Sequence, residues 1–384
     1  MSRLRKKLED KANVTIVVYV HGWKHNAEFN DSNVIQFRKI LQGVRATELI
    51  TETPRDVVGI YVGWRGRSLD VPEPLLNVTF WTRKEAASRV AQGSVRELFS
   101  RLTGFQRHHN GLDKDCKPSK TVTRPRCDIR MLLIGHSFGA WVLYSAINES
   151  LIEGIAAERD IGDESRAAAR FADMVVLINP AFEGSRYESL HRAARERKDI
   201  KYQAPIFVSV TSSADWATGL AFPAGRLLST VFQRPVSSSD QSEAISNTLG
   251  HIDRYTTHDL TKSEQSTTEC GNWRDATNMK GEERMAQLKA NVLAEERNEK
   301  AFFGSQLDNE ALKPGWTRKF CGGAVLTHLA TQDVRSNPNS PVWMVRADKS
   351  IISGHNDIAD VAFTSFVRQL YHDVTMHPFA FRFR

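Results

Sequence analysis

The chain has 384 residues, of which 41% are hydrophobic and 25% are charged, and its formal net charge is +7. This composition supplies enough apolar residues for a real core, so it excludes a disordered, collagen-like or small disulfide-rich chain. No run approaches the ~20 apolar residues that a membrane span needs, and no apolar signal core follows the basic N-terminus. We therefore expect a soluble, cytoplasmic protein of about one to three domains.

The basic residues are scattered along the chain, and the densest groups, at residues 3–7 and 192–201, contain no interleaved aromatic side chains. Nucleic-acid binding requires a clustered basic stripe with stacking residues, so nucleic acid is not expected as a partner. A positive field also attracts anionic surfaces and substrates, which leaves peripheral contact with a membrane surface open.

Four cysteines give little guidance about the redox state. Cys116, Cys127, Cys270 and Cys321 show no C-x-x-C spacing, which argues against a zinc ribbon or a thioredoxin-like site. Cys116 and Cys127 could pair across a loop, but free thiols are the expectation. No metal site and no cofactor are expected.

Six short, nearly continuous apolar runs are typical of strands that are buried on both faces of a parallel sheet. Helical patterns lie between them, with apolar residues three and four positions apart. This alternation indicates a doubly wound, mainly parallel α/β sheet. In chain order, the expected strands are Val14–Val20, Val57–Val62, Met131–Ile134, Met174–Ile178, Ile206–Val210 and Val342–Val345, and the expected helices span residues 31–50, 84–102, 138–151 and 357–371.

Two features depart from a compact α/β domain. The first core strand begins almost at the N-terminus, so any preceding edge strands are missing or belong to residues outside this chain. Between Asp215 and Pro341 the rhythm of strands and helices breaks over a long, mostly polar segment. We predict one domain over residues 1–384, in which residues 216–341 form an inserted cap beside the functional edge of the sheet. An independent second domain is the alternative.

The most informative stretch is Gly135-His136-Ser137-Phe138-Gly139, which follows an apolar strand and precedes a helix. A serine that attacks a carbonyl carbon must stand on a sharp, strained strand-to-helix turn, where neighbouring side chains would collide. Glycine at positions 135 and 139 removes those collisions. The N-terminal amides of the following helix favour a developing oxyanion. The stretch therefore predicts that Ser137 is a catalytic nucleophile.

A second motif, Val18-Tyr19-Val20-His21-Gly22-Trp23, ends the first expected strand. Together with the strand–turn–helix around Ser137, it resembles the α/β-hydrolase superfamily, and within it lipases and esterases rather than proteases. The resemblance runs from about Val14 to the final helix. It implies a mainly parallel sheet of the α/β-hydrolase fold, without its usual N-terminal edge strands and with a large insertion before the last core strand.

The same resemblance implies an oxyanion hole made of backbone amides. A His-Gly pair at this place turns the chain, so the N–H groups of Trp23 and Phe138 are the expected oxyanion donors. His21 either braces this loop or, with His136 and Trp216, contacts the substrate. The apolar segment 216–232 lines an acyl pocket, forms a mobile lid or is a buried connection.

Serine needs a base, because its free hydroxyl is a weak nucleophile at neutral pH. In hydrolases of this fold the order along the chain is Ser, then Asp or Glu, then His. Asp215 follows an apolar strand and is the predicted acid, because the carboxyl ends of parallel strands carry the site. Glu183, after the preceding strand, is its rival, and Asp348 is a weaker third candidate.

Six histidines follow Asp215, and the base is expected in the loop after the last core strand. His355 lies there, after Gly354 and before a helix, and is the predicted base. His328 lies in an apolar run and is expected to be a packed core histidine. His251 and His258 fall in the insertion, where they either contact substrate or are solvated.

These features predict a serine hydrolase that cleaves a small-molecule or lipid carboxylic ester through a Ser137–Asp215–His355 triad and an acyl-enzyme. A hydrolase of thioesters or amides would use the same residues. The alternative from another class is a non-catalytic, hydrolase-like binding module.

Overall fold

The computed structural model describes residues 13–23, 25–51, 54–64, 90–108, 110, 129–160, 171–197, 201–222, 238–265, 267–330 and 336–376. Its strands are β1 (Val14–Val20), β2 (Asp56–Val62), β3 (Ile129–His136), β4 (Met174–Ile178), β5 (Phe207–Ser212), β6 (His258–Lys262), β7 (Thr317–Lys319), β8 (Ala324–His328) and β9 (Val342–Ala347). Its α-helices are α2 (Ser32–Leu49), α5 (Arg96–Arg107), α6 (Phe138–Asp160), α7 (Glu188–Glu196), α9 (Ser239–Ser246), α10 (Gly281–Gln306) and α11 (Val361–Met376). Shorter helical turns are η1 (Ala91–Val95), η3 (Gly184–Arg186), η4 (Ala217–Ala221), η5 (Leu249–His251), η6 (Asp253–Tyr255) and η7 (Thr268–Cys270).

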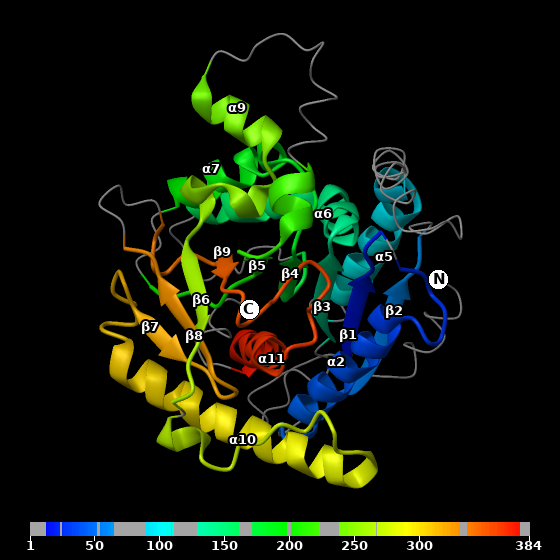
Figure 1. Cartoon of the computed structure of the whole chain (residues 1–384), viewed down its shortest axis with the longest axis vertical. Coiled ribbons are helices and arrows are strands. Elements are labelled where there is room, and N and C mark those ends of the chain that lie inside the picture. Colours follow the sequence, from blue (N-terminus) through cyan, green and yellow to red (C-terminus); the bar gives the residue numbers. More distant parts are fainter. Residues whose placement is uncertain are drawn as a thin grey trace.

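The described strands form one mixed sheet in the order β2-β1-β3-β4-β5-β9-β6-β8-β7 (Figure 1). Every pairing from β2 to β6 is parallel, whereas β8 is antiparallel to both β6 and β7. The prediction of a mainly parallel α/β sheet is thus confirmed. All six expected strands are present, each within two residues of its expected ends.

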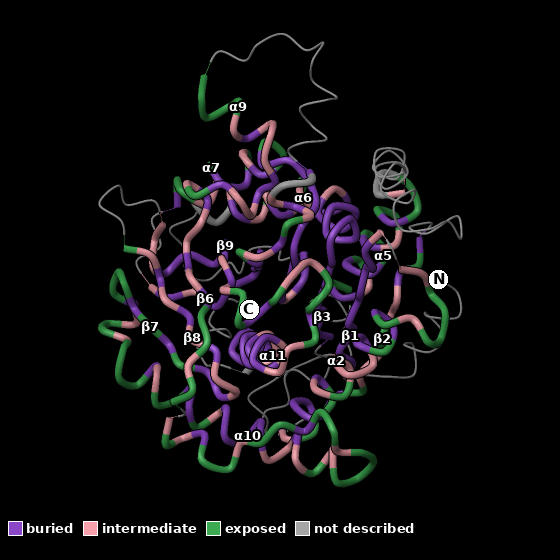
Figure 2. Tube along the Cα trace, viewed as in Figure 1, coloured by how far each residue is buried: buried purple, intermediate pink, exposed green. Residues whose placement is uncertain are grey.

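Helices cover both faces of the sheet (Figure 1). Helices α5, α6 and α7 pack on one face, and α2, α10 and α11 pack on the other. Strand β1 is buried at every residue because its alternate side chains enter these two layers, Ile16 and Val18 on one side and Val17 and Tyr19 on the other. Figure 2 shows β1 and β3 as buried, and it shows α6 and α11 as largely buried helices, whereas exposed residues lie on α10. Two-sided burial explains most of the continuous apolar runs of the sequence.

The region that we predicted to be an inserted cap contributes strands to the sheet itself. Strand β6 pairs with β9, and the β7–β8 hairpin extends the edge further. Helix α10, which buries Leu288 and Val292, packs against α2 and α11. Between His258 and His328, strands β6, β7 and β8 thus lengthen the sheet, and α10 packs on one of its faces. The division of the chain into domains stays a prediction.

A disulfide joins Cys270, at the end of η7, to Cys321, in the turn between β7 and β8. The two Cα atoms are 5.5 Å apart, across a sequence separation of 51. The expectation of free thiols was wrong for this pair, because the C-x-x-C pattern detects only neighbouring cysteines, whereas the fold brings two distant segments together. Cys116 and Cys127 lie outside the described residues.

Candidate active site

Ser137 lies on the turn between β3 and α6, with a backbone φ of +57°. Residues other than glycine seldom adopt this left-handed conformation, and it persists only where the surroundings hold it. The backbone N–H of Ser137 donates to the carbonyl of Ile178 at 2.9 Å, and its carbonyl accepts from the N–H of Ala181 at 3.2 Å. The strained turn is therefore fixed from both sides by the chain that follows β4.

The glycines at either side of this turn are required by contact. A Cβ atom on Gly135 would lie 2.7 Å from the Cα of Ala140, and one on Gly139 would lie 2.1 Å from the carbonyl oxygen of Val20. Both distances are shorter than non-bonded carbon atoms allow. The steric reason that we gave for the Gly-x-Ser-x-Gly pattern is confirmed.

The structure brings the three predicted triad residues together. The hydroxyl of Ser137 lies 2.7 Å from Nε2 of His355, and Nδ1 of His355 lies 2.8 Å from Oδ2 of Asp215. Ser137 follows β3, Asp215 follows β5 and His355 follows β9, so the parallel strands deliver all three to one edge. Because Asp215 only accepts, Nδ1 of His355 carries the proton and Nε2 is free to accept the Ser137 hydroxyl proton. The Asp215 side chain is fully buried and that of His355 is 17% exposed.

Four hydrogen bonds hold the carboxylate of Asp215, counting the one from His355. Its Oδ1 accepts the backbone N–H groups of Ala217 and Thr218 at 3.0 and 3.2 Å, and its Oδ2 accepts the Thr218 hydroxyl at 2.6 Å, beside the bond from His355. Burial raises the pKa of Asp215, but the bonds from His355 and Thr218 outweigh it and the pKa is lowered. The carboxylate is therefore charged and fixed in orientation.

A second histidine stands behind this carboxylate. Nε2 of His251 lies 3.0 Å from the Thr218 hydroxyl. Since that hydroxyl gives its hydrogen to Asp215, His251 donates to it. Burial lowers the pKa of His251, against the opposing charge of Asp215, so the ring is neutral. We expected His251 either to contact the substrate or to be solvated. The structure instead places it in a series of hydrogen bonds that runs through Thr218 to Asp215.

The loop that carries His355 is tied down by three side chains. Nε2 of His136 and Nδ2 of Asn179 both donate to the carbonyl of His355 at 2.9 Å. The hydroxyl of Ser212 donates to the carbonyl of Ile352 at 2.5 Å. Asn179 is buried, has a φ of +45° and also accepts the N–H of Ser212. Sequence reasoning missed Asn179, although a polar residue directly after β4 was a usable signal.

Two residues that we considered as substrate contacts, His136 and His21, are buried and hydrogen-bonded to the loops around the site. His136 is 1% exposed, and burial, with the nearby His355, lowers its pKa to about 3. His21 is fully buried, and burial lowers its pKa to about 4. Nδ1 of His21 donates to the carbonyl of Gly22, and its Nε2 accepts the N–H of Trp64 at 3.1 Å. His21 thus has the bracing role that was one of its two expected roles, and a substrate contact of either residue stays a prediction.

Trp216 and the two expected oxyanion donors remain compatible with their predicted roles. Trp216 is 60% exposed, beside Asp215. Residues Val20 and Gly135 pair across β1 and β3, which places the loop after β1 next to the turn. The rings of Trp23 and Phe138 lie 6.2 Å apart there. These three roles stay predictions, and residues 223–232 of the expected acyl-pocket segment lie outside the described residues.

The rival acids and the other histidines are engaged elsewhere. Glu183 pairs with Arg186 at 3.1 Å, and Asp348 accepts from Ser350. His328 is buried and bonded to the N–H of Gly315, as expected of a packed core histidine. His258, which we expected at a solvated or substrate-facing position, is 1% exposed because β6 is an internal strand of the sheet.

Comparisons with protein-family models, with curated proteins and with solved structures found no significant match to this chain. The structure places it among proteins with a mixed, mainly parallel α/β sheet. The chemistry of the site has to be inferred from the arrangement of its own side chains.

Proposed function

We propose that this chain is a serine hydrolase of carboxylic esters, with an α/β-hydrolase-like fold of the lipase and esterase type. The observation that carries the proposal is the continuous line of hydrogen bonds from the Ser137 hydroxyl through His355 to Asp215. Such a line activates a serine that is a weak nucleophile by itself. The serine stands on a strained turn at the carboxyl edge of the sheet, the place where a nucleophile elbow presents its hydroxyl.

Each side chain has one task in the proposed reaction. His355 takes the proton of Ser137 as the serine oxygen attacks the acyl carbon, and Asp215 stabilises the imidazolium that forms. His355 then gives this proton to the departing alcohol oxygen, which leaves an acyl group on Ser137. Water, deprotonated by His355, attacks the acyl-enzyme, and the proton returns to Ser137 as the acid is released. The amides of Trp23 and Phe138 would stabilise the two oxyanions.

The disulfide bears on where such an enzyme would work. Disulfides persist in oxidising compartments and are rare in the cytosol. The Cys270–Cys321 bond therefore favours an oxidising location over the cytoplasmic one that the sequence suggested. Within the part of the chain that the structure describes, no helix is both long enough and apolar enough to cross a membrane.

The proposal is tested by labelling with a fluorophosphonate probe, which reacts with activated serines. We expect labelling of the wild-type protein and none of the Ser137→Ala and His355→Ala variants. Ser353→Ala is the matched control, because Ser353 is an exposed serine in the same loop as His355 and bonds only to Asp357 among the described residues. Labelling that survives in Ser137→Ala, or fails in folded wild type, contradicts the proposal and favours a binding module.

Substrate class is tested with matched acyl donors. An acetyl and an octanoyl ester are compared with the octanoyl thioester and amide, using wild type and Ser137→Ala. We expect the esters to be hydrolysed fastest and the acyl-length ratio to separate an esterase from a lipase. Faster turnover of the thioester or the amide would replace the ester assignment and keep the same nucleophile.

A further inference from the structure

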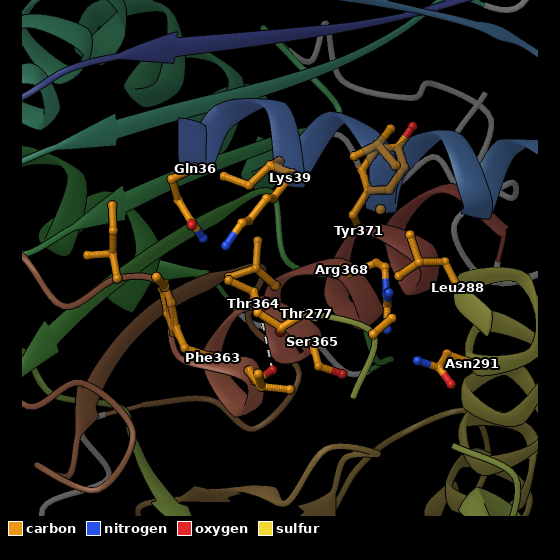
Figure 3. Close-up of a pocket in the computed structure, with 18 of the residues that line it drawn as sticks. Gln36, Lys39, Thr277, Leu288, Asn291, Phe363, Thr364, Ser365, Arg368 and Tyr371 are labelled. Carbon is orange, nitrogen blue, oxygen red and sulfur yellow. Dashed lines mark hydrogen bonds between the residues drawn. The ribbon is translucent and has the colours of Figure 1, made fainter. Parts of the chain in front are cut away.

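A cavity lies between α2, α10 and α11, on the face of the sheet that those helices cover (Figure 3). Its empty volume is about 970 Å³, including the open solvent at its mouth. None of Ser137, Asp215 and His355 belongs to its lining, so this cavity is separate from the candidate active site.

The floor of the cavity is formed by apolar side chains. Leu132 and Ile134 from β3, Ile178 from β4 and Phe363 from α11 line it, and each is at most 3% exposed. These side chains offer water no hydrogen-bond partner, and a buried water needs several polar partners. The floor therefore suits the hydrocarbon part of a ligand.

Two polar side chains enter this apolar space from α2. Gln36 is only 6% exposed, and Lys39 is half-buried one helical turn later. Figure 3 shows both side chains directed into the cavity with their polar ends toward each other. Across the ranges that the structure describes, neither side chain forms a hydrogen bond or an ion pair. The Lys39 ammonium and the Gln36 amide N–H groups are therefore free to donate to a polar ligand group.

The other charges at the cavity leave it positive. Arg368 is paired with Glu295, whose carboxylate accepts from its Nε at 3.2 Å. Arg284 donates only to backbone carbonyls, those of Ala276 and Thr277, among the described residues. Among the remaining lining charges, two cations, Lys39 and Arg284, face one acid, Asp275, which interacts with Arg284, so the balance is one positive charge. The charge balance favours a ligand with a negative group.

We propose that this cavity binds an amphipathic carboxylate, an aliphatic acid anion. The ammonium of Lys39 and the amide N–H of Gln36 donate to the two carboxylate oxygens, and the chain lies on Leu132, Ile134, Ile178 and Phe363. One ammonium and one amide match a carboxylate better than a phosphate, which is usually bound by arginine forks or several backbone amides. The site goes beyond the proposed function, because binding here does not require Ser137 to react.

The test is a calorimetric titration of sodium octanoate into full-length Ser137→Ala protein, with 1-octanol as the neutral counterpart. We expect saturable binding of octanoate and about tenfold or more weaker binding of octanol. Lys39→Met should weaken octanoate binding about tenfold or more, and Gln36→Glu should weaken it further by repulsion. Arg45→Met is the matched control, because Arg45 is an exposed cation on α2 outside the cavity, and it should change the affinity less than twofold, roughly.

Thermal melting of each variant establishes that it is folded before titration. Absence of saturable binding, equal affinity in Lys39→Met and Arg45→Met, or octanol binding as tight as octanoate overturns the inference. The titration uses protein without the Ser137 hydroxyl, so its result is independent of serine reactivity. Fluorophosphonate labelling without octanoate binding rejects only this inference, and binding without labelling rejects only the proposed function.

Discussion

Two histidine–carboxylate pairs in this molecule have nearly the same geometry and different surroundings. Nδ1 of His355 lies 2.8 Å from Asp215, and Nδ1 of His372 lies 2.7 Å from Glu299. The first pair lies on loops at the carboxyl edge of the sheet. The second joins α11 to α10 inside the fold. A histidine oriented by a carboxylate is therefore not by itself a sign of catalysis.

What separates the pairs is the other ring nitrogen. Nε2 of His355 meets the Ser137 hydroxyl, and its side chain is 17% exposed. Nε2 of His372 is buried, has no hydrogen-bond partner among the described residues, and belongs to a side chain that is 5% exposed. A proton can be exchanged with a substrate only at the first site. The comparison shows that a candidate catalytic pair differs from a structural clamp in two ways: a hydroxyl lies at the second ring nitrogen, and the ring is accessible to solvent.

The buried pair also belongs to a larger charged cluster. Glu299, His372 and Asp373 offer ligand atoms within 4.8 Å of one another, close enough for a metal ion. However, Arg318 donates to both oxygens of Asp373 and already compensates its charge. The aromatic rings of Phe302, Phe303 and Phe320 lie within 5.4 Å of the Arg318 guanidinium. This cluster is best explained as a clamp that holds β7, α10 and α11 together.

The largest expected effect comes from neutralising each carboxylate in turn. Asp215→Asn should lower kcat on an ester roughly 10⁴-fold, because the amide favours the wrong tautomer of His355. Glu299→Gln should leave the kcat of folded protein unchanged, since its pair does not touch Ser137. Steady-state kinetics with one chromogenic ester measure both. A similar kcat loss in Glu299→Gln would remove the distinction between the pairs.

For the free energy of unfolding, in contrast to kcat, we expect the buried cluster around Asp373 to matter most. Arg318→Met leaves Asp373 buried without its cation and should destabilise the fold by about 3–5 kcal/mol. Arg346→Met is the control, because Arg346 pairs with Asp259 at a partly exposed position and should cost about 1 kcal/mol or less. Urea unfolding measures both free energies. Equal losses in the two variants would show that the buried cluster is not a clamp.

A smaller effect is expected from the hydrogen bonds that link His251 through Thr218 to Asp215. Thr218→Val removes the hydroxyl between His251 and Asp215 and should lower kcat about 10–100-fold, the equivalent of one hydrogen bond to a charged group. Thr218→Ser keeps the hydroxyl and should restore most of the rate. Because Thr218 only positions Asp215, KM should change little. A Ser variant as slow as the Val variant would assign the loss to packing.

The smallest effect is the pH dependence of the buried pair. Burial lowers the pKa of His372, but its hydrogen bond to Glu299 and the charges of Glu299, Asp373 and Glu295 outweigh this and raise the pKa. The stabilisation is complete below the ordinary histidine pKa of about 6.5 and is lost as the pH rises through the raised value. Urea unfolding from about pH 6 to pH 9 should show this decline in wild type and a flatter profile in His372→Gln. Identical profiles would contradict it.

Much of the fold and site could be predicted because the relevant signals are local. Apolar runs located β1 through β5 and β9 to within two residues. Two-sided burial explains the runs of β1, β3, β4, β5 and β9, whereas β2 lies at the edge of the described sheet and only its Val62 is buried. The contacts of Gly135 and Gly139 lie within a few residues or on the adjoining strand, so the pentapeptide indicated the turn at Ser137. Asp215 and His355 followed from the chain order that the resemblance implies, together with their places after two strands of a parallel sheet.

The sequence by itself therefore determined a parallel α/β sheet and the identity of the three residues that meet at its edge. Only the tertiary structure decided which histidines are braces, that Asn179 and His251 support the site, that β6, β7 and β8 join the sheet, and that Cys270 pairs with Cys321. The physical reason is the sequence distance over which each effect acts. Periodicity and turn sterics act between near neighbours, whereas burial and cross-chain hydrogen bonds depend on which distant segments the sheet brings side by side.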